Sequence, residues 1–157
     1  ADLASGTAGG SLAVGSDRLS GIEDLGGTIY GDRLAGNAVA NRLDGEDGAD
    51  ELVGRGGADR FDYDYTSDST PVAPDLIRDF SRSQGDKIDL AGIDAPEGGN
   101  LTFQFIGQRA FTAAGQVRFF QQDGDTFVQA NTYGTSGAEM TIKVDPLVSF
   151  QATDFLL

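Results

Sequence analysis

The sequence predicts an all-β fold, in which nine-residue units of one turn and one short strand form a coil that antiparallel strands follow. Three observations predict it. Gly supplies 23 of the 157 residues without the three-residue period of collagen. Residues with side-chain oxygens recur every nine places, at Asp32, Asn41, Asp50 and Asp59. Large apolar residues recur two places after them, at Leu34, Leu43, Leu52 and Phe61.

Each unit combines a tight turn with three extended residues. The units read GNAVANRLD, GEDGADELV and GRGGADRFD. Glycines open each unit or take its fourth place, where a turn needs positive φ: Gly36, Gly45, Gly48, Gly54 and Gly57. In the extended part only the middle residue turns inward. Two units complete one coil, so Asp32 is expected to stack near Asp50, and Asn41 near Asp59.

The composition restricts what these stacked side chains can bind. The formal charge of −14 excludes nucleic acid as a natural partner, and no basic amphipathic segment favours membrane insertion. The chain has no Cys and no His, so thiolate and imidazole ligands are absent. Stacked carboxylates repel unless a cation lies between them. A hard, oxygen-binding cation such as Ca²⁺ is therefore expected.

The repeat resembles the RTX (hemolysin-type) calcium-binding repeat, GGxGxDxUx, in which U is a large apolar residue. The resemblance implies a right-handed parallel β-roll with two to four calcium ions between turns. The expected ligands are the aligned side chains and the turn glycines: Asp32, Asn41, Asp50, Asp59, Gly45, Gly48, Gly54 and Gly57. Second-place Gly is replaced by Asn37, Glu46 and Arg55, and fourth-place Gly by Tyr30 and Val39. Turns 45–50 and 54–59 are expected to be well formed and the upstream turns weaker. The alternative is that Gly-Asp turns close the chain without metal.

The segments SDSTPVAPD and GDKIDL, within residues 67–90, resemble the region after the repeats in serralysin-type secreted metalloproteases. They are also similar to the end of the repeat modules (R-modules) of secreted alginate C5-epimerases. The protease resemblance implies a further calcium held by Asp68 and Asp75. The alternative is a Pro-rich surface loop whose Asp residues serve the turns.

The second half of the chain predicts further strands. Short strands are expected at 75–80 and 87–90, and four antiparallel strands at 101–106, 116–121, 127–132 and 140–144. Asp123-Gly124 predicts a hairpin between two of them. Residues 1–63 are interpreted as roll with lead-in, with an earlier turn at 15–19, and residues 64–157 as a C-terminal β region of one continuous module.

Charged residues outside the repeat's sixth place are expected to pair internally. Arg42 and Arg60 should stack on one sheet face beside Asp44 and Asp62, although such a ladder could instead hold anionic polysaccharide. Arg33 should stack near Glu51 on the opposite face. Exposed pairs of this kind contribute about 0–1 kcal/mol each.

No catalytic constellation is present, so the chain itself is not expected to be an enzyme. The end of the sequence resembles the terminus of type I secretion substrates, an acidic residue and three apolar ones: Asp154, Phe155, Leu156 and Leu157. The absence of an initial Met suggests a fragment. The expected function is a calcium-binding C-terminal module of a secreted bacterial enzyme, a metalloprotease or an epimerase. Its partners would be the upstream catalytic domain and the secretion machinery. The alternative is a polysaccharide (alginate)-binding module of a mannuronan C5-epimerase.

Overall fold

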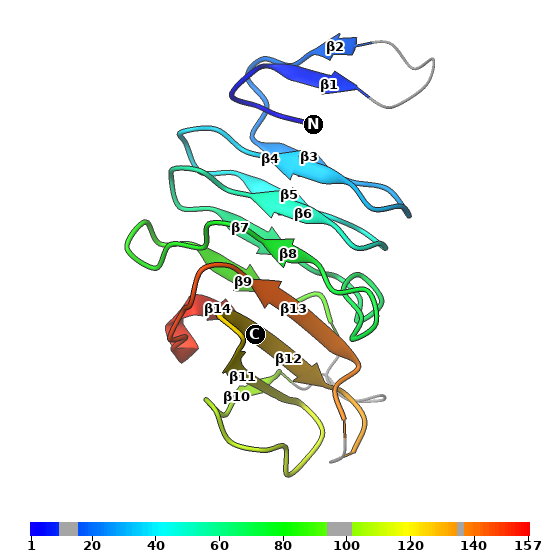
Figure 1. Ribbon diagram of the computed structural model, residues 1–157, viewed down its shortest axis with the longest axis vertical. Helices are drawn as coiled ribbons and strands as arrows, with labels where there is room; N and C mark the ends of the chain where they lie inside the picture. Colours follow the sequence, from blue (N-terminus) through cyan, green and yellow to red (C-terminus); the bar gives the residue numbers. More distant parts are fainter. Residues whose placement is uncertain (10–15, 94–101, 135–136) are drawn as a thin grey trace.

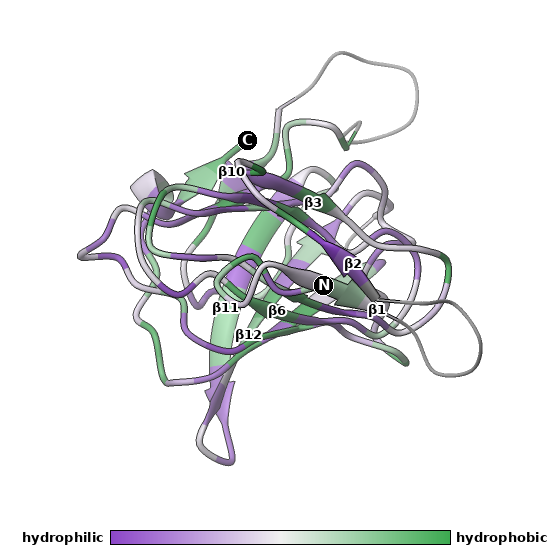
Figure 2. Cartoon of the chain, turned by 90° about the horizontal axis from the view of Figure 1, so that it is seen from above, coloured by the Kyte–Doolittle hydropathy of each residue, from purple (hydrophilic) through white to green (hydrophobic). Residues whose placement is uncertain are grey.

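The computed structural model describes residues 1–9, 16–93, 102–134 and 137–157. The molecule is a stack of short strands with one short 3₁₀ helix, Ala152–Asp154, in the described part of the chain (Figure 1). In the view from above, the coils lie over one another along the long axis (Figure 2). The all-β prediction is confirmed.

The repeat forms the expected parallel coil. Five strands of three residues alternate between two sheets: β3 (Asp24–Gly26), β4 (Arg33–Ala35), β5 (Arg42–Asp44), β6 (Glu51–Val53) and β7 (Arg60–Asp62). β4 pairs with β6, and β5 pairs with both β3 and β7, always in parallel. Leu34 lies opposite Leu52, and Leu43 opposite Phe61, so one coil takes 18 residues.

The inward residue of each strand builds the core of the roll. Leu43, Leu52 and Phe61 have no exposed surface, because the single inward side chain of each strand is covered by the coils on both sides. Leu25 begins this column nine residues before Leu34, so the coil starts one unit earlier than the four aligned repeats. Ile77 and Ile88 continue the column beyond the repeat.

Both sheets of the roll run on into the C-terminal half. β8 (Leu76–Ile77) pairs with β6 on one side and with β13 (Met140–Val144) on the other, both in parallel. The seven-stranded sheet therefore has the order β10-β11-β12-β13-β8-β6-β4. The five-stranded sheet has the order β14-β9-β7-β5-β3, where β9 is Lys87–Asp89 and β14 is Phe155–Leu156.

Three of the four expected C-terminal strands are antiparallel neighbours. β11 (Gln116–Gln122), β12 (Asp125–Asn131) and β13 form this meander. Asp123 and Gly124 join β11 to β12 with φ of 54° and 94°, which confirms the predicted two-residue hairpin.

The prediction for the first of these strands was wrong in direction. β10 (Gln104–Phe105) pairs with β11 in parallel, and Leu101 lies outside the described residues. The connection at 106–115 returns the chain to the end from which β10 started. Alternating hydrophobicity indicates a strand but carries no information about its direction.

The lead-in also differs from the expected turn. β2 (Ser16–Arg18) pairs in antiparallel fashion with β1 (Thr7–Gly9), so Asp17 lies in a hairpin strand, and Gly15 is outside the described residues. Asp17 is out of phase with the nine-residue repeat, which explains why this segment does not join the coil. Residues 1–3 run beside β4 instead: Ala35 N–H donates to Ala1 O and Leu3 N–H to Ala35 O.

Candidate metal centre

The sixth residue of each turn bonds to the coil before it. Asp32 N–H donates to Asp50 Oδ1 at 2.7 Å, and Asn41 N–H donates to Asp59 Oδ1 at 2.9 Å. The parallel coil brings these side chains together, because residues 18 apart occupy the same place in successive coils. The predicted stacking is confirmed.

The same contact continues beyond the repeat. Asp50 N–H donates to Asp75 Oδ1 at 2.8 Å, and Asp59 N–H donates to Asp86 Oδ1 at 3.0 Å. Asp75 therefore joins Asp50, although a longer loop separates them in the sequence. Asp86 was not among the predicted ligands. It lies 27 residues, or three repeat lengths, after Asp59. Ile88 has the same spacing from Phe61, so the nine-residue spacing indicated Asp86 as well.

The second carboxylate oxygen of three of these residues has no partner. Asp50 Oδ2, Asp59 Oδ2 and Asp75 Oδ2 are buried without a hydrogen bond. In the described part of the chain, no Lys or Arg forms an ion pair with any of five buried carboxylates: Asp50, Asp59, Asp68, Asp75 and Asp86. A buried carboxylate without a counter-charge strongly disfavours the folded state.

The upstream turns satisfy their own sixth-place oxygen. Thr28 N–H donates to Asp32 Oδ2, and Asn37 N–H donates to Asn41 Oδ1, each at 2.8 Å. Asn41 also donates from Nδ2 to Glu23 O. These two turns are closed by internal hydrogen bonds.

The turns at 45–50 and 54–59 are open instead. Their second-place residues, Glu46 and Arg55, have φ of 61° and 68°. Their amides donate elsewhere, Glu46 N–H to Asp44 Oδ1 and Arg55 N–H to Asp79 Oδ2. No second-place amide therefore reaches the free oxygen of Asp50 or Asp59. The expectation was of well-formed turns at 45–50 and 54–59 and weaker turns upstream; the difference seen is one of hydrogen bonding, and the upstream turns are the more completely bonded pair.

Glycine is required where these free oxygens lie. A Cβ on Gly45 would stand 2.3 Å from Asp50 Oδ2, and one on Gly54 would stand 2.4 Å from Asp59 Oδ2. Gly57 has φ of 108°, and a Cβ there would meet Val39 C at 2.4 Å. The turns therefore bring backbone and carboxylate closer than any side-chain-bearing residue allows.

Burial raises the pKa of these acids. The pKa of Asp50 and that of Asp59 rise to about 6, and that of Asp75 rises to about 7. Loss of hydration is the largest cause in each, and backbone hydrogen bonds oppose it. The negative charges of Asp50 and Asp68 also raise the pKa of Asp75, so these three acids form one electrostatic group. Burial, then the charge of Asp75, raises the pKa of the buried Tyr63 hydroxyl.

The loop at 68–75 folds back onto this group. Asp68 Oδ2 accepts the N–H groups of Asp64 and Tyr65 at 2.9 and 2.8 Å, which makes it a turn cap. Ser69 Oγ accepts the N–H of Asp75 at 2.8 Å and holds its backbone in place. Both acids expected to share a metal are buried; Asp75 contacts Asp50, whereas Asp68 caps its own turn and acts on the other two through its charge.

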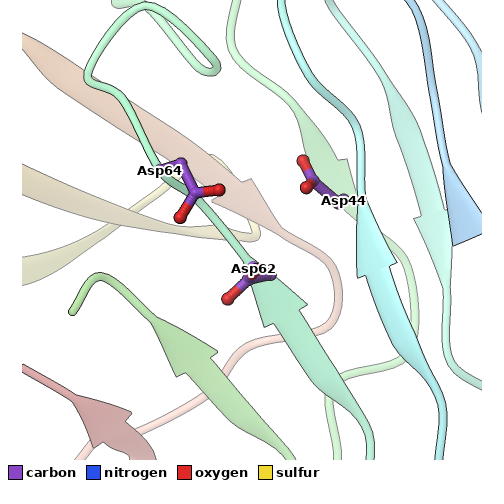
Figure 3. Close-up of side chains that lie close together, drawn as sticks. All are labelled: Asp44, Asp62 and Asp64. Atoms are coloured by element: carbon purple, nitrogen blue, oxygen red, sulfur yellow. The ribbon is translucent and has the colours of Figure 1, made fainter. Parts of the chain in front are cut away.

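A second acidic cluster differs from the first because arginine side chains pair with it. Carboxylate oxygens of Asp44, Asp62 and Asp64 lie within 4.8 Å of one another (Figure 3). Arg42 forms ion pairs with all three, at 3.1 Å to Asp44 and 3.9 Å to Asp64. Arg60 also pairs with Asp62, at 3.1 Å. The predicted internal pairing of the two arginines is confirmed, and their positive charge already offsets this cluster.

The pairing expected on the opposite sheet is also present. Arg33 Nε lies 2.9 Å from Glu51 Oε1, and Arg78 binds the other carboxylate oxygen at 2.9 Å. More than half of the Arg33 side chain is exposed, so this network belongs to the surface of the roll.

The last residues of the sequence form part of the core. Asp154 Oδ2 accepts Arg82 Nε and Gln151 N–H, each at 2.7 Å. β14 then pairs with β9 in parallel, and the Phe155 ring lies 5.3 Å from the Phe150 ring. The residues interpreted as a secretion signal are thus folded into the end of the five-stranded sheet.

A family profile identifies the class of module. The family profile described as "Peptidase M10 serralysin C terminal" matches residues 15–157. The chain belongs to this family. Serralysin C-terminal modules are non-catalytic parts of secreted enzymes, so the expected class of module is correct. The described residues contain no helix long and apolar enough to cross a bilayer.

Among solved structures, the serralysin-type module is similar to the solution structure of the AlgE6R3 subunit of a mannuronan C5-epimerase from Azotobacter vinelandii. The identity is 23%, with coverage of 85% of this chain and 76% of the other and a TM-score of 0.48. A search of curated protein sequences gave no match.

Proposed function

We propose that this module binds calcium in the open turns of its roll and folds only when the metal is present. One observation carries the proposal: five buried carboxylates lack a cationic partner among the described residues, and three of their oxygens lack any hydrogen bond. A divalent cation would neutralise these charges. The chain has no His and no Cys, so only oxygen ligands are available, which suits Ca²⁺.

The ligands fall into two groups, one at each row of turns. Asp50, Asp68 and Asp75 would hold calcium on one side, with the carbonyls of Gly45 and Gly48. On the other side Asp59 and Asp86 would act with the carbonyls of Gly54 and Gly57. The closed turns of Asp32 and Asn41 add outer oxygens. Two to four ions are expected.

Calcium binding of this kind would make folding depend on location. A ligand at about 100 times its dissociation constant stabilises the folded state by ~2.7 kcal/mol per site, and far below that constant by almost nothing. Extracellular modules bind calcium with constants of roughly 10⁻⁴–10⁻³ M. The chain would stay unfolded inside the cell and fold outside, beside the catalytic domain of its parent enzyme.

Export by a type I machinery is part of the same proposal. The terminal residues Asp154 to Leu157 would be recognised in the unfolded chain, because Asp154 and Phe155 are buried once β14 forms. Folding before export would therefore hide the proposed signal.

A calcium titration tests the proposal. Metal-free protein, prepared with chelator, is titrated with Ca²⁺ while far-ultraviolet circular dichroism and calorimetry are recorded, with Mg²⁺ as the control ion. A cooperative gain of β-sheet signal with Ca²⁺ and little response to Mg²⁺ are expected. A native spectrum in excess chelator, unchanged by Ca²⁺, would contradict the proposal.

Carbohydrate binding is a second candidate function, and one observation favours it. The outer face of β11 and β12 carries half-buried aromatic rings beside Arg118. No carboxylate of the described residues forms an ion pair with Arg118.

A further inference from the structure

Tyr63 takes a place in the coil that glycine occupies one coil earlier. Asp62 lies opposite Asp44 where β7 pairs with β5. The residues that follow them, Tyr63 and Gly45, therefore occupy the same place in successive coils. A Cβ on Gly45 would lie 2.3 Å from Asp50 Oδ2. The same place on the next coil thus directs the Tyr63 side chain toward the buried carboxylates.

The Tyr63 side chain is enclosed, and its hydroxyl lacks a partner. The residue has no exposed surface, and its hydroxyl oxygen forms no hydrogen bond with the described residues. Asp75 Oδ2 is likewise buried without a partner. Phe would fill nearly the same volume without burying a hydroxyl, and a buried Tyr hydroxyl usually has a hydrogen-bond partner. Packing alone therefore does not account for a tyrosine in this place.

The hydroxyl lies close to the carboxylates of one row of turns. Burial raises the pKa of Tyr63, and the negative charges of Asp75, Asp50 and Asp68 raise it further, that of Asp75 most. Burial also raises the pKa of Asp75, and the Tyr63 hydroxyl opposes that rise. A donor that approaches an ionised carboxylate has this effect. Asp75 is thus the carboxylate nearest in influence to the hydroxyl.

A hydroxyl differs from a basic side chain as the neighbour of a metal-binding carboxylate. Arg42 pairs with the three acids of the second cluster, and its positive charge offsets theirs. The Tyr63 hydroxyl can donate one hydrogen bond but carries no charge. The negative charge of Asp75 therefore stays available for a cation. Carboxylates that bind metals are commonly held by hydrogen bonds from such neighbours.

We propose that Tyr63 is a positioning residue of the metal site: in the calcium-loaded module its hydroxyl donates to Asp75 Oδ2 and holds that carboxylate in its binding orientation. The bond uses one lone pair of Oδ2 and leaves the other for the ion. Tyr63 acts through Asp75 and is not itself a ligand. The inference rests on the proposed calcium function and adds to it a residue that is not one of the acids.

The test compares two tyrosine-to-phenylalanine variants of the full chain by competition for calcium with a chromophoric chelator. Tyr63→Phe keeps the ring and removes only the hydroxyl, and calcium affinity should fall by roughly ten-fold. Tyr65→Phe is the matched control. Its side chain is exposed, and it contacts Asp68 through its backbone N–H, which the substitution keeps. Circular dichroism at saturating calcium checks that both variants fold.

Two further measurements distinguish positioning from packing. The first is the same substitution in the Asp75→Asn background, where Tyr63→Phe should cause no further loss of affinity. The second is the carboxyl ¹³C resonance of Asp75 at saturating calcium, when folding is complete in every variant. It should move in Tyr63→Phe, while the resonances of Asp59 and Asp86, on the other row of turns, should not.

The outcomes separate this inference from the proposed function. A loss of about ten-fold in Tyr63→Phe alone, absent in the Asp75→Asn background and accompanied by the shift at Asp75, supports the inference. Unchanged affinity of Tyr63→Phe, while the wild-type chain binds calcium, overturns the inference and leaves the proposed function intact. An equal loss in both backgrounds, or an unmoved Asp75 resonance, indicates packing and also overturns it. A wild-type chain that binds no calcium overturns both.

Discussion

The backbone amide of Asp50 donates to Oδ1 of Asp75 at 2.8 Å, across a separation of 25 residues. This contact uses one oxygen of Asp75 and leaves Oδ2 buried without a partner. The carboxylate therefore has two separable roles. Oδ1 supports the backbone of the coil, and the charge on the group disfavours folding unless a cation neutralises it.

The substitution Asp75→Asn separates these roles. An amide oxygen still accepts the N–H of Asp50, but the buried negative charge is gone. The metal-free protein should gain about 1–3 kcal/mol in the free energy of unfolding, while the stabilisation by calcium should shrink. Urea denaturation with and without Ca²⁺ measures both effects. Asp123→Asn, an equal charge change in an exposed turn that Asn tolerates, should alter neither. Loss of stability in both metal states would contradict the assignment.

The stability of the metal-free protein should fall as the pH rises. The pKa values of Asp50 and Asp59 in the folded state are about 6 and that of Asp75 is about 7, above the ordinary value of about 3.9. Between pH ~4 and pH ~7 the folded state therefore holds more protons than the unfolded chain, and protonation stabilises it. Calcium-loaded protein should show the reverse trend, because protons compete with the metal. Urea midpoints are measured from pH 4.5 to 8. They should fall with rising pH in chelator and rise with it in calcium.

Gly45→Ala should disrupt the open turn. The added Cβ would lie 2.3 Å from Asp50 Oδ2 and would displace the carboxylate from its place. Calcium affinity should fall by roughly ten-fold or more, equivalent to 1.4 kcal/mol for each factor of ten. Gly26→Ala is the control, since a Cβ at Gly26 meets nothing within 4 Å. Equal calcium affinities of the two variants would show that the open turn at 45–50 does not bind the ion.

Arg82→Ala should weaken the docking of the last strand. It removes the Nε donor 2.7 Å from Asp154 Oδ2 and leaves a buried carboxylate with only the amide of Gln151. A loss of about 1–3 kcal/mol is expected, together with faster amide exchange in β14 and β9. The double variant Arg82→Ala with Asp154→Asn should recover part of this loss, because no buried charge remains. Unchanged exchange in β14 would argue against this role for the ion pair.

Arg33→Ala should have little effect. Its partner Glu51 keeps the contact with Arg78 at 2.9 Å, and the Arg33 side chain is largely exposed. The free energy of unfolding should change by no more than about 1 kcal/mol. A larger loss in thermal unfolding would show that the surface network contributes to the stability of the roll.

Much of the roll could be predicted because two nine-residue units of the sequence correspond to one coil of the fold. One inward residue per unit gives the column from Leu34 to Phe61, and the spacing of 18 residues brings Asp32 beside Asp50. The same period would have located Leu25 and Asp86. The unit around Leu25 keeps only its fourth-place Gly21, and the unit around Asp86 has no glycine in its first or fourth place. The phase of the inward apolar residue is the more dependable signal.

Other features could not be predicted from the sequence. The parallel direction of β10 depends on how the connection at 106–115 returns, which alternation does not encode. The contrast between open and closed turns depends on the positive φ of Glu46 and Arg55 and on Asp79, a residue outside the repeat that accepts the amide of Arg55. The contact of Arg118 with the Phe111 ring depends on how the connection at 106–115 lies, which the strand pattern does not encode.

The position of β14 sets an order for the assembly of the molecule. Phe155 closes a group of rings that includes Phe105 and Phe150, and β14 completes the sheet beside β9. A variant that lacks residues 155–156 has no such closure, whatever the metal concentration around it. The ring group and the β9 edge then stay open, so metal binding in the turns and completion of the core are separate steps.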